Sequence, residues 1–401
     1  MWEYSVIALI LFGVSLLTYY LRYKQIDVYF LILSTYLCVS ACSVLYAYDN
    51  PNTYTNLSIW GFIYLVLVVL ICISPYRGKT IDKIHVPDEE SVFIKLLFFI
   101  YLFSGVVSVA YTLPKAITLS QMDDWASIRD DVYNDFEGIE LYTNQFERLC
   151  KNLYNYISPF GVVWTFCQLT KNKFNKWLVF SSLIVWSLEQ YSSAMLIASR
   201  GMVFKFVVKF ITLFIFFRAS IPAKRKKYIY AFGGIVAIFY LSYALSVTES
   251  RFGDDANDSL YTYFGHSMLS FNNDVFGSMT DYADGRYLFK WIFEALGLDP
   301  TIDFVQLGST HGTAFVTFVG CFFFDFGLIG TLILALLLNR LITLSTKNLG
   351  SYAGMIVFFY FASWFIDGVF VVGRSQSLSW LMLFVLMFIV KRIDVKTVKH
   401  I

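Results

Sequence analysis

Long apolar segments recur along the whole chain, and no other feature limits its fold as strongly. Eleven of them are long enough to cross about 30 Å of hydrocarbon as helices. Lipid offers no hydrogen-bond partner to an open backbone, so each crossing segment must be helical. They cover residues 4–20, 26–47, 57–74, 93–113, 152–170, 177–197, 201–217, 228–247, 313–338, 350–370 and 376–390. The sequence therefore predicts an all-α polytopic membrane protein, with residues 1–401 forming a single integral membrane domain.

The composition points the same way. Of the 401 residues, 57% are hydrophobic and 15% are charged, whereas soluble domains carry about 25% charged residues. The six cysteines lie mostly inside apolar segments without disulfide or metal spacing, so we expect small core residues. Arg22 and Lys24 follow the first apolar run instead of preceding it, which argues against a cleavable signal peptide. We expect membrane lipids as partners and no nucleic acid.

The distribution of basic residues predicts the orientation. Connections on one side of the predicted bundle hold 20 Lys and Arg residues, and those on the other side hold nine. Cytoplasmic connections carry the excess of basic residues in membrane proteins. With eleven crossings, this places the N-terminus in the periplasm and the C-terminus in the cytoplasm of a bacterial inner membrane.

Two connections on the predicted periplasmic side are much longer than the other connections between the predicted helices. The first, residues 114–151, is rich in Asp and Glu. The second, residues 248–312, mixes carboxylates, aromatic residues and glycine. Within it, residues 286–296 read as an apolar helix with Lys290 and Glu294 one turn apart. Such a helix would lie in the plane of the interface.

Several ionisable residues fall inside the predicted crossings, where a charge needs a partner or a water-filled cavity. We single out Lys205, Lys209 and Asp325 as intramembrane polar support, and Glu189 belongs to the same group. Lys205 and Lys209 are four residues apart and share a helix face. Their depths allow a Lys209–Asp325 pair. Such a pair would fix helix packing, and Lys205 could instead extend toward the headgroups.

Three arginines lie at the predicted periplasmic ends of helices, where the charge rule does not favour cations. They are Arg200 in Ser-Arg-Gly, Arg251 in Ser-Arg-Phe-Gly and Arg374 in Gly-Arg-Ser. Arginine holds phosphate through a planar fork and stays charged at any relevant pH. Three arginines at the same membrane depth on three helices suggest a site where their side chains converge on one anion. The alternative is that each arginine reaches lipid headgroups.

Histidine is scarce in the chain. His266 and His311 fall in the second long connection, and imidazole suits general-base work near neutral pH. Each could instead be a loop residue that hydrogen-bonds the local backbone. No phosphate-binding glycine loop, dinucleotide fingerprint or HExxH or CxxC metal motif is present in the sequence. We therefore expect no metal and no cofactor. Arginine side chains would supply the positive charge that binds an anionic substrate.

Three stretches of the sequence resemble those of a known protein family. The stretch TAFVTFVGCFFFDFGLIG, from Thr313 to Gly330, resembles the signature helix of bacterial oligosaccharide repeat unit polymerases, the Wzy-type O-antigen polymerases. The Ser-Arg-Gly step at Arg200 is similar to a turn of that family. The tyrosine-rich segment from Tyr261 to Asn272 resembles part of its main periplasmic loop. The likeness covers the whole chain in topology and residues 190–375 in motifs.

The resemblance implies an activity. Such polymerases transfer a glycan en bloc from undecaprenyl pyrophosphate to an incoming lipid-linked repeat unit, on the periplasmic side of the membrane. It implies a metal-independent glycosyltransferase whose Arg200, Arg251 and Arg374 bind pyrophosphate. His311 is the first choice for the base, followed by His266 or Glu249. A chain-length regulator protein is a further expected partner.

Three other activities compete with this interpretation. An O-antigen ligase shares the design but passes the glycan to a final acceptor. A lipid-linked oligosaccharide flippase would use residues such as Lys205 and Lys209, but the two long outer connections argue against it. A transferase that uses a polyprenyl phosphate sugar is disfavoured, because the short connection at residues 48–56 carries one acid only.

Overall fold

The computed structural model has helices and no strands in its described part, which comprises residues 2–79, 90–120, 125, 142–252, 256–304, 307–308, 316–347, 349–370, 374 and 376–398. Each of the eleven predicted apolar segments falls on a helix. Their bounds are α1 (Val6–Tyr23), α2 (Val28–Asp49), α3 (Ile59–Ile73), α4 (Val92–Ser120), α6 (Gln145–Thr170), α7 (Lys176–Leu196), α8 (Arg200–Phe217), α9 (Ala223–Phe252), α12 (Thr317–Ser345), α13 (Tyr352–Asp367) and α14 (Gln376–Val398).

Seven helical segments of the described chain are long and apolar enough to cross a membrane, which confirms a polytopic membrane protein. They are Trp2–Tyr23, Val28–Asp49, Ile59–Tyr76, Val92–Ser120, Ala223–Ser250, Thr317–Ser345 and Gln376–Ile393. Of the other four helices, α13 is apolar but only 16 residues long. Polar and charged side chains lower the mean hydropathy of α6 and α7, and α8 carries three charged residues, Arg200, Lys205 and Lys209.

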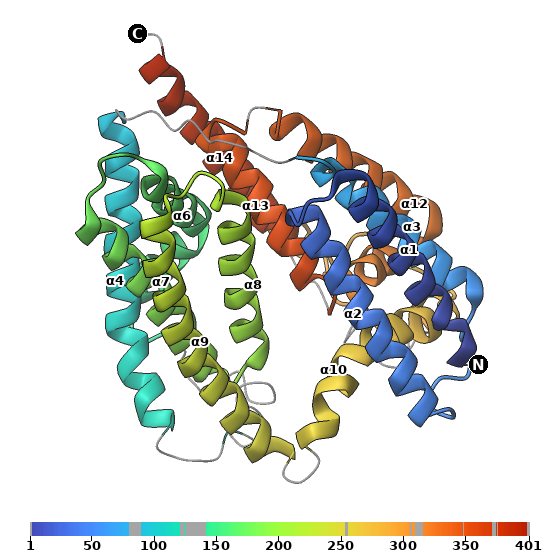
Figure 1. Cartoon of the computed structure of the whole chain (residues 1–401). Helices are drawn as coiled ribbons and strands as arrows, with labels where there is room; N and C mark the ends of the chain where they lie inside the picture. The colour runs from blue at the N-terminus through green and yellow to red at the C-terminus, as the bar shows by residue number, and fades with distance from the viewer. Residues whose placement is uncertain are drawn as a thin grey trace. The chain divides into compact units, whose positions relative to one another are not determined.

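The chain divides into two compact units. Unit 1 contains Met1–Thr80, Asn257–Lys347 and Phe361–Met382, and unit 2 contains Ile81–Ala256, Asn348–Tyr360 and Leu383–Ile401. Both α13 and α14 contribute residues to each unit. In unit 1, α1 packs on α2 and α3, and α12 lies along α3 (Figure 1). In unit 2, α4, α6 and α7 lie side by side in the same view, with α8 against α7.

Polar residues at the segment ends explain where several helices begin. Asp27 caps α2 by accepting from the N–H of Phe30, and Asn144 caps α6 by accepting from the N–H of Glu147. Asn175 accepts from two backbone N–H groups at the start of α7. Each cap satisfies donors that the first helical turn leaves without an intrahelical partner.

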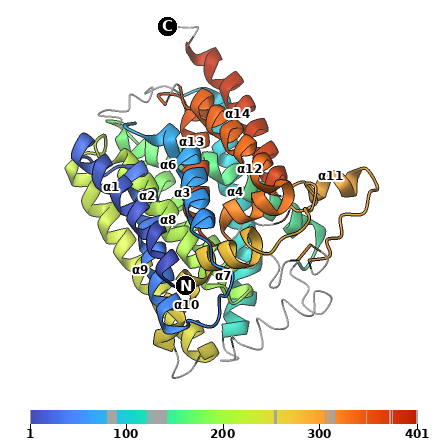
Figure 2. The same ribbon diagram turned by 90° about the vertical axis from the view of Figure 1, so that its right-hand side faces the viewer.

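The described part of the second long connection includes several helical segments. It contains α10 (Ala256–Ser270), the π-helical turn η4 (Phe271–Phe276) and α11 (Lys290–Ala295). A helix is present at the place expected for the interfacial helix, but it spans six residues instead of eleven, since residues 286–289 form turns before Lys290. Figure 2 shows α11 projecting beside α12. The first connection is shortened as well, since α4 continues to Ser120 and α6 begins at Gln145.

The Asp-Phe-Gly step of α12 binds the second long connection to this helix. The buried Asp325 carboxylate accepts from the backbone N–H groups of Tyr287 and Leu288, at 3.0 and 2.7 Å. Two residues later Gly327 leaves the helical conformation, with φ +62° and ψ −165°. This region is accessible essentially to glycine alone. A Cβ atom on Gly327 would lie 2.5 Å from Cζ of Tyr282, whose ring covers the kink.

We expect Gly327→Ala to destabilise the protein by about 3 kcal/mol, from backbone strain and the clash with Tyr282. Thermal unfolding of the detergent-solubilised chain measures the effect. Gly234→Ala in α9 is the matched control, because a Cβ there meets no atom within 4 Å, and removing glycine from a helix interior stabilises by about 0.5–1 kcal/mol. Equal melting temperatures for the two variants would contradict this description of the kink.

At one end of unit 2, a single carboxylate holds two helices. Glu90 accepts from Trp164, Gln168 and Lys171 of α6, and from the hydroxyl of Tyr352 at the start of α13. The Lys171–Glu90 ion pair is 2.8 Å long and almost fully buried. These four contacts fix the end of α6 that lies away from the polar groups described next.

Candidate functional site

Arg200 stands at the first position of α8. The chain leaves α7 through a tight turn in which Ala198 has a left-handed φ of +44° and the N–H of Ser199 bonds back to the carbonyl of Ala194. The Arg200 guanidinium then donates to Oγ1 of Thr248 in α9, at 2.8 Å. This bond joins the start of α8 to the last turns of α9. We call this region the Arg200 end of unit 2.

Arg251 belongs to the same end by its place in the backbone. It lies three residues after Thr248 in α9, so the two positions share one helix face. Trp125 covers the neighbouring turns of α9: its N–H and its Nε1–H donate to Ser250 and Ser246, both at 3.2 Å. The structure thus brings the backbone positions of two of the three predicted arginines to one end of one unit.

Arg374, the third arginine, belongs to unit 1. It is exposed, and its guanidinium donates to the carbonyl of Pro300 at 2.9 Å. Its convergence with Arg200 and Arg251 stays a prediction.

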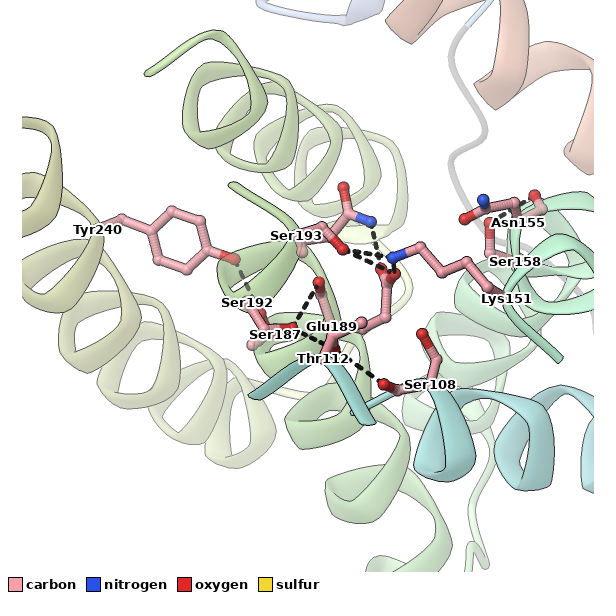
Figure 3. Close-up of polar contacts among 11 residues, drawn as sticks. Ser108, Thr112, Lys151, Asn155, Ser158, Ser187, Glu189, Ser192, Ser193 and Tyr240 are labelled. Atoms are coloured by element: carbon pink, nitrogen blue, oxygen red, sulfur yellow. Dashed lines mark hydrogen bonds and ion pairs between the residues drawn. The ribbon is translucent and has the colours of Figure 1, made fainter. Parts of the chain in front are cut away.

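A buried ion pair joins α6 and α7 in unit 2 (Figure 3). Lys151 of α6 pairs with Glu189 of α7 and also donates to Ser193. The Glu189 side chain is fully buried, and Ser193 and Gln190 donate to its carboxylate oxygens at 3.1 and 2.6 Å. Removing a charge from water costs several kcal/mol unless it is paired and hydrogen-bonded. Here the carboxylate takes donors from three side chains.

A second pair extends this cluster to α4. Lys115 and Glu147 form an ion pair of 3.1 Å, and Glu147 is fully buried. Glu147 and Lys151 are four residues apart in α6 and therefore neighbours on the helix. Lys115, Glu147, Lys151 and Glu189 form a ladder of alternating charge through α4, α6 and α7, which we call the charge ladder.

Sequence reasoning missed most of the charge ladder. It singled out Glu189 as an intramembrane acid but proposed no partner for it. A usable signal was present, because Glu147 and Lys151 have the spacing of an intrahelical pair. Lys115 and Lys151 are also among the few cations on the predicted periplasmic side.

The three residues proposed as intramembrane polar support lie in different units. Lys205 and Lys209 share one face of α8 in unit 2, where Lys205 is exposed and Lys209 is part-buried. Asp325 belongs to unit 1, where two backbone N–H groups supply hydrogen bonds that a lysine was expected to supply. The Lys209–Asp325 pair stays a prediction.

His266 lies in α10 of unit 1, and thus on a helix instead of the expected loop. Its Nδ1 is hydrogen-bonded to the hydroxyl of Tyr54, and its ring packs on Tyr46 with centroids 4.4 Å apart. Burial, opposed by a hydrogen bond with Ser270, raises the pKa of Tyr54 above its usual range. A neutral imidazole that accepts this hydrogen bond at Nδ1 carries its hydrogen on Nε2. In this state His266 would donate a hydrogen bond at Nε2.

The other two candidates for the base differ in position. Glu249 is an exposed residue of α9, one residue after Thr248. His311 lies outside the described residues, so its role as first choice stays a prediction. Within the described ranges, no group of three or more His, Cys, Asp and Glu side chains could hold a metal ion.

The chain was compared with known families, proteins and structures. No family model matches it, and neither a curated protein nor a solved structure does.

Proposed function

We propose that this chain is a membrane glycosyltransferase that polymerises oligosaccharides linked to a polyprenyl diphosphate, as the Wzy-type O-antigen polymerases do. One observation carries the proposal: the Arg200–Thr248 bond joins α8 to α9, so that the positions of Arg200 and Arg251 meet at one end of unit 2. Two guanidinium groups suit a diphosphate, whose oxygens accept paired hydrogen bonds.

The reaction would run as a displacement at the anomeric carbon of the donor glycan. A hydroxyl oxygen of the acceptor sugar attacks this carbon and its proton passes to a base, for which His311 is the first choice. The bond from carbon to the diphosphate oxygen breaks, and the diphosphate leaves with the electron pair. Arg200, Arg251 and, in this proposal, Arg374 would stabilise the negative charge that grows on the leaving group.

The topology follows from the same proposal. We infer eleven crossings of a bacterial inner membrane, with the Arg200 end facing the periplasm and the C-terminus in the cytoplasm. A phosphatase fused after Ile401, active only outside the cytoplasm, would then be inactive. The helices at all eleven expected segments and the excess of cations on one side support this arrangement.

Deleting the gene in its own bacterium tests the function. A polymerase defect leaves lipopolysaccharide with the core and one repeat unit, because single repeats are still attached. Bare core would instead identify a ligase, and accumulation of the repeat on the cytoplasmic leaflet would identify a flippase. Reintroducing the wild-type gene must restore the long glycan chains.

A further inference from the structure

The outward surface of α6 has two unlike sectors. One carries Phe146, Leu149 and Leu153, whose exposed fractions are 50%, 63% and 38%. The other carries five polar residues that recur at helical spacing, at positions i, i+3, i+4, i+7 and i+10. They are Arg148, Lys151, Asn152, Asn155 and Ser158. We call the second surface the polar sector.

The two sectors lie on the same three turns and need different surroundings. Exposed leucine and phenylalanine suit lipid, whereas exposed arginine and asparagine do not. With 26 residues, α6 is about 39 Å long, and hydrocarbon is about 30 Å thick. At most about 9 Å, or six residues, can therefore stand above the hydrocarbon. In the proposed eleven-helix topology, Asn155 and Ser158 lie deeper than that, so this part of the polar sector would face water inside the membrane, whereas Arg148 stands above the hydrocarbon.

Lys151 links the polar sector to the charge ladder, because it belongs to both. Lys151 lies at the edge of the sector, with 13% of the side chain exposed, and reaches inward to Glu189 and Ser193. Figure 3 shows Asn155 and Ser158 on α6 beside the Lys151 side chain. Lys151 is paired with Glu189, so the other sector residues offer amides, a hydroxyl and the guanidinium of Arg148 to a ligand.

The polar sector lies near the Arg200 end of unit 2. Lys151 is bonded to Ser193, and the next residue, Ala194, accepts from Tyr243 of α9 at 2.7 Å. Thr248, the acceptor for Arg200, follows Tyr243 by five residues in α9. Five residues of helix rise only about 7.5 Å. A ligand with a diphosphate at Arg200 and a chain of sugars attached could therefore reach α6.

We infer that the polar sector of α6 binds the sugar hydroxyls of the oligosaccharide carried by the lipid-linked substrate. The inference rests on the proposed function. Each asparagine amide offers two donors and one acceptor, which complements hydroxyl groups that both donate and accept. Asn152, Asn155 and Ser158 are spread over about 9 Å of helix. This spacing suits a chain of sugars, whereas a phospholipid headgroup needs its cations gathered at one point.

Thiol labelling tests the sector directly in the full-length protein, reconstituted in lipid nanodiscs. Asn155→Cys should react with a charged, membrane-impermeant thiol reagent at least about tenfold faster than Leu153→Cys, since an apolar setting suppresses the reactive thiolate. The oligosaccharide repeat, released from its lipid by mild acid, should slow the reaction of Asn155→Cys. Wild-type protein gives the background from the native cysteines. Equal rates for the two variants, or no protection by the oligosaccharide, would overturn the inference.

Binding of the same released oligosaccharide gives a second test. Replacing both Asn152 and Asn155 with leucine should raise its Kd by about tenfold, through the loss of two or more hydrogen bonds. Leu149→Ala, on the apolar sector of the same helix, should leave Kd unchanged. An unchanged Kd for the leucine variant refutes the sector even if the wild type polymerises. Conversely, tight binding that depends on both asparagines, in a wild type that forms no polymer, refutes the polymerase and leaves the glycan site standing.

Discussion

Replacing Arg200 with lysine should lower the rate of polymer formation by about 10²–10³-fold, the usual effect of removing one donor that stabilises charge in a transition state. Lysine keeps the charge but loses the planar fork, and with it the geometry that serves both Thr248 and a phosphate. The rate is measured as the amount of long-chain glycan formed per unit of protein, in membranes that lack the native chain.

Two controls give this result its meaning. Arg340→Ala removes an exposed arginine of α12 and should leave the glycan chains at full length. Thr248→Val removes the hydroxyl that holds Arg200 but keeps both arginines, so it should reduce the rate by about tenfold or less. Full-length polymer at the normal rate from Arg200→Lys would remove this residue from the diphosphate site.

The second large effect concerns stability. Lys151→Met should destabilise the protein by about 3–5 kcal/mol, because it leaves the fully buried Glu189 carboxylate without its cation. The remaining donors, Ser193 and Gln190, are neutral and do not offset the charge. A lower melting temperature of the purified variant, measured in the same detergent as the wild type, would register the loss.

Removing both charges should restore most of this stability, since replacing a buried pair with apolar residues of similar size is often neutral or stabilising. We expect the double variant Lys151→Met with Glu189→Leu to melt close to the wild type. A Lys151→Met variant as stable as the wild type would show that the pair does not carry the packing of α6 on α7. Lys290→Met is the exposed control, because its i,i+4 pair with Glu294 is solvated.

Sequence reasoning succeeded where the signal is local. The length and hydropathy of a segment decide whether it is a helix in lipid, and helices were found at all eleven expected places. Within the second connection, where one interfacial helix was expected, α10 and the turn η4 are also present. The polar residues of α10 and the kink at Gly327 made these helical segments hard to predict from the sequence. Contacts with other helices stabilise them, such as the hydrogen bond from Ser43 Oγ to the carbonyl of Gly265.

The pairing of charges could not be read from the sequence. Depth along a helix suggested Lys209 for Asp325, but depth does not specify which helices are neighbours. Asp325 instead binds the backbone of Tyr287 and Leu288, from a turn 37 residues earlier in the chain. Glu189 found its lysine on α6, because α4, α6 and α7 pack together. Among these charged residues, only Glu147 and Lys151 have a spacing in the sequence that indicates neighbouring side chains.

The most direct test of the proposed function uses purified full-length protein in lipid nanodiscs with a defined lipid-linked repeat unit and no added metal. Our account predicts a ladder of glycans that grow by one repeat at a time on the lipid, with one polyprenyl diphosphate released for each bond formed. Recovery of the single-repeat lipid alone, under conditions where the protein is folded and binds that lipid, would contradict it.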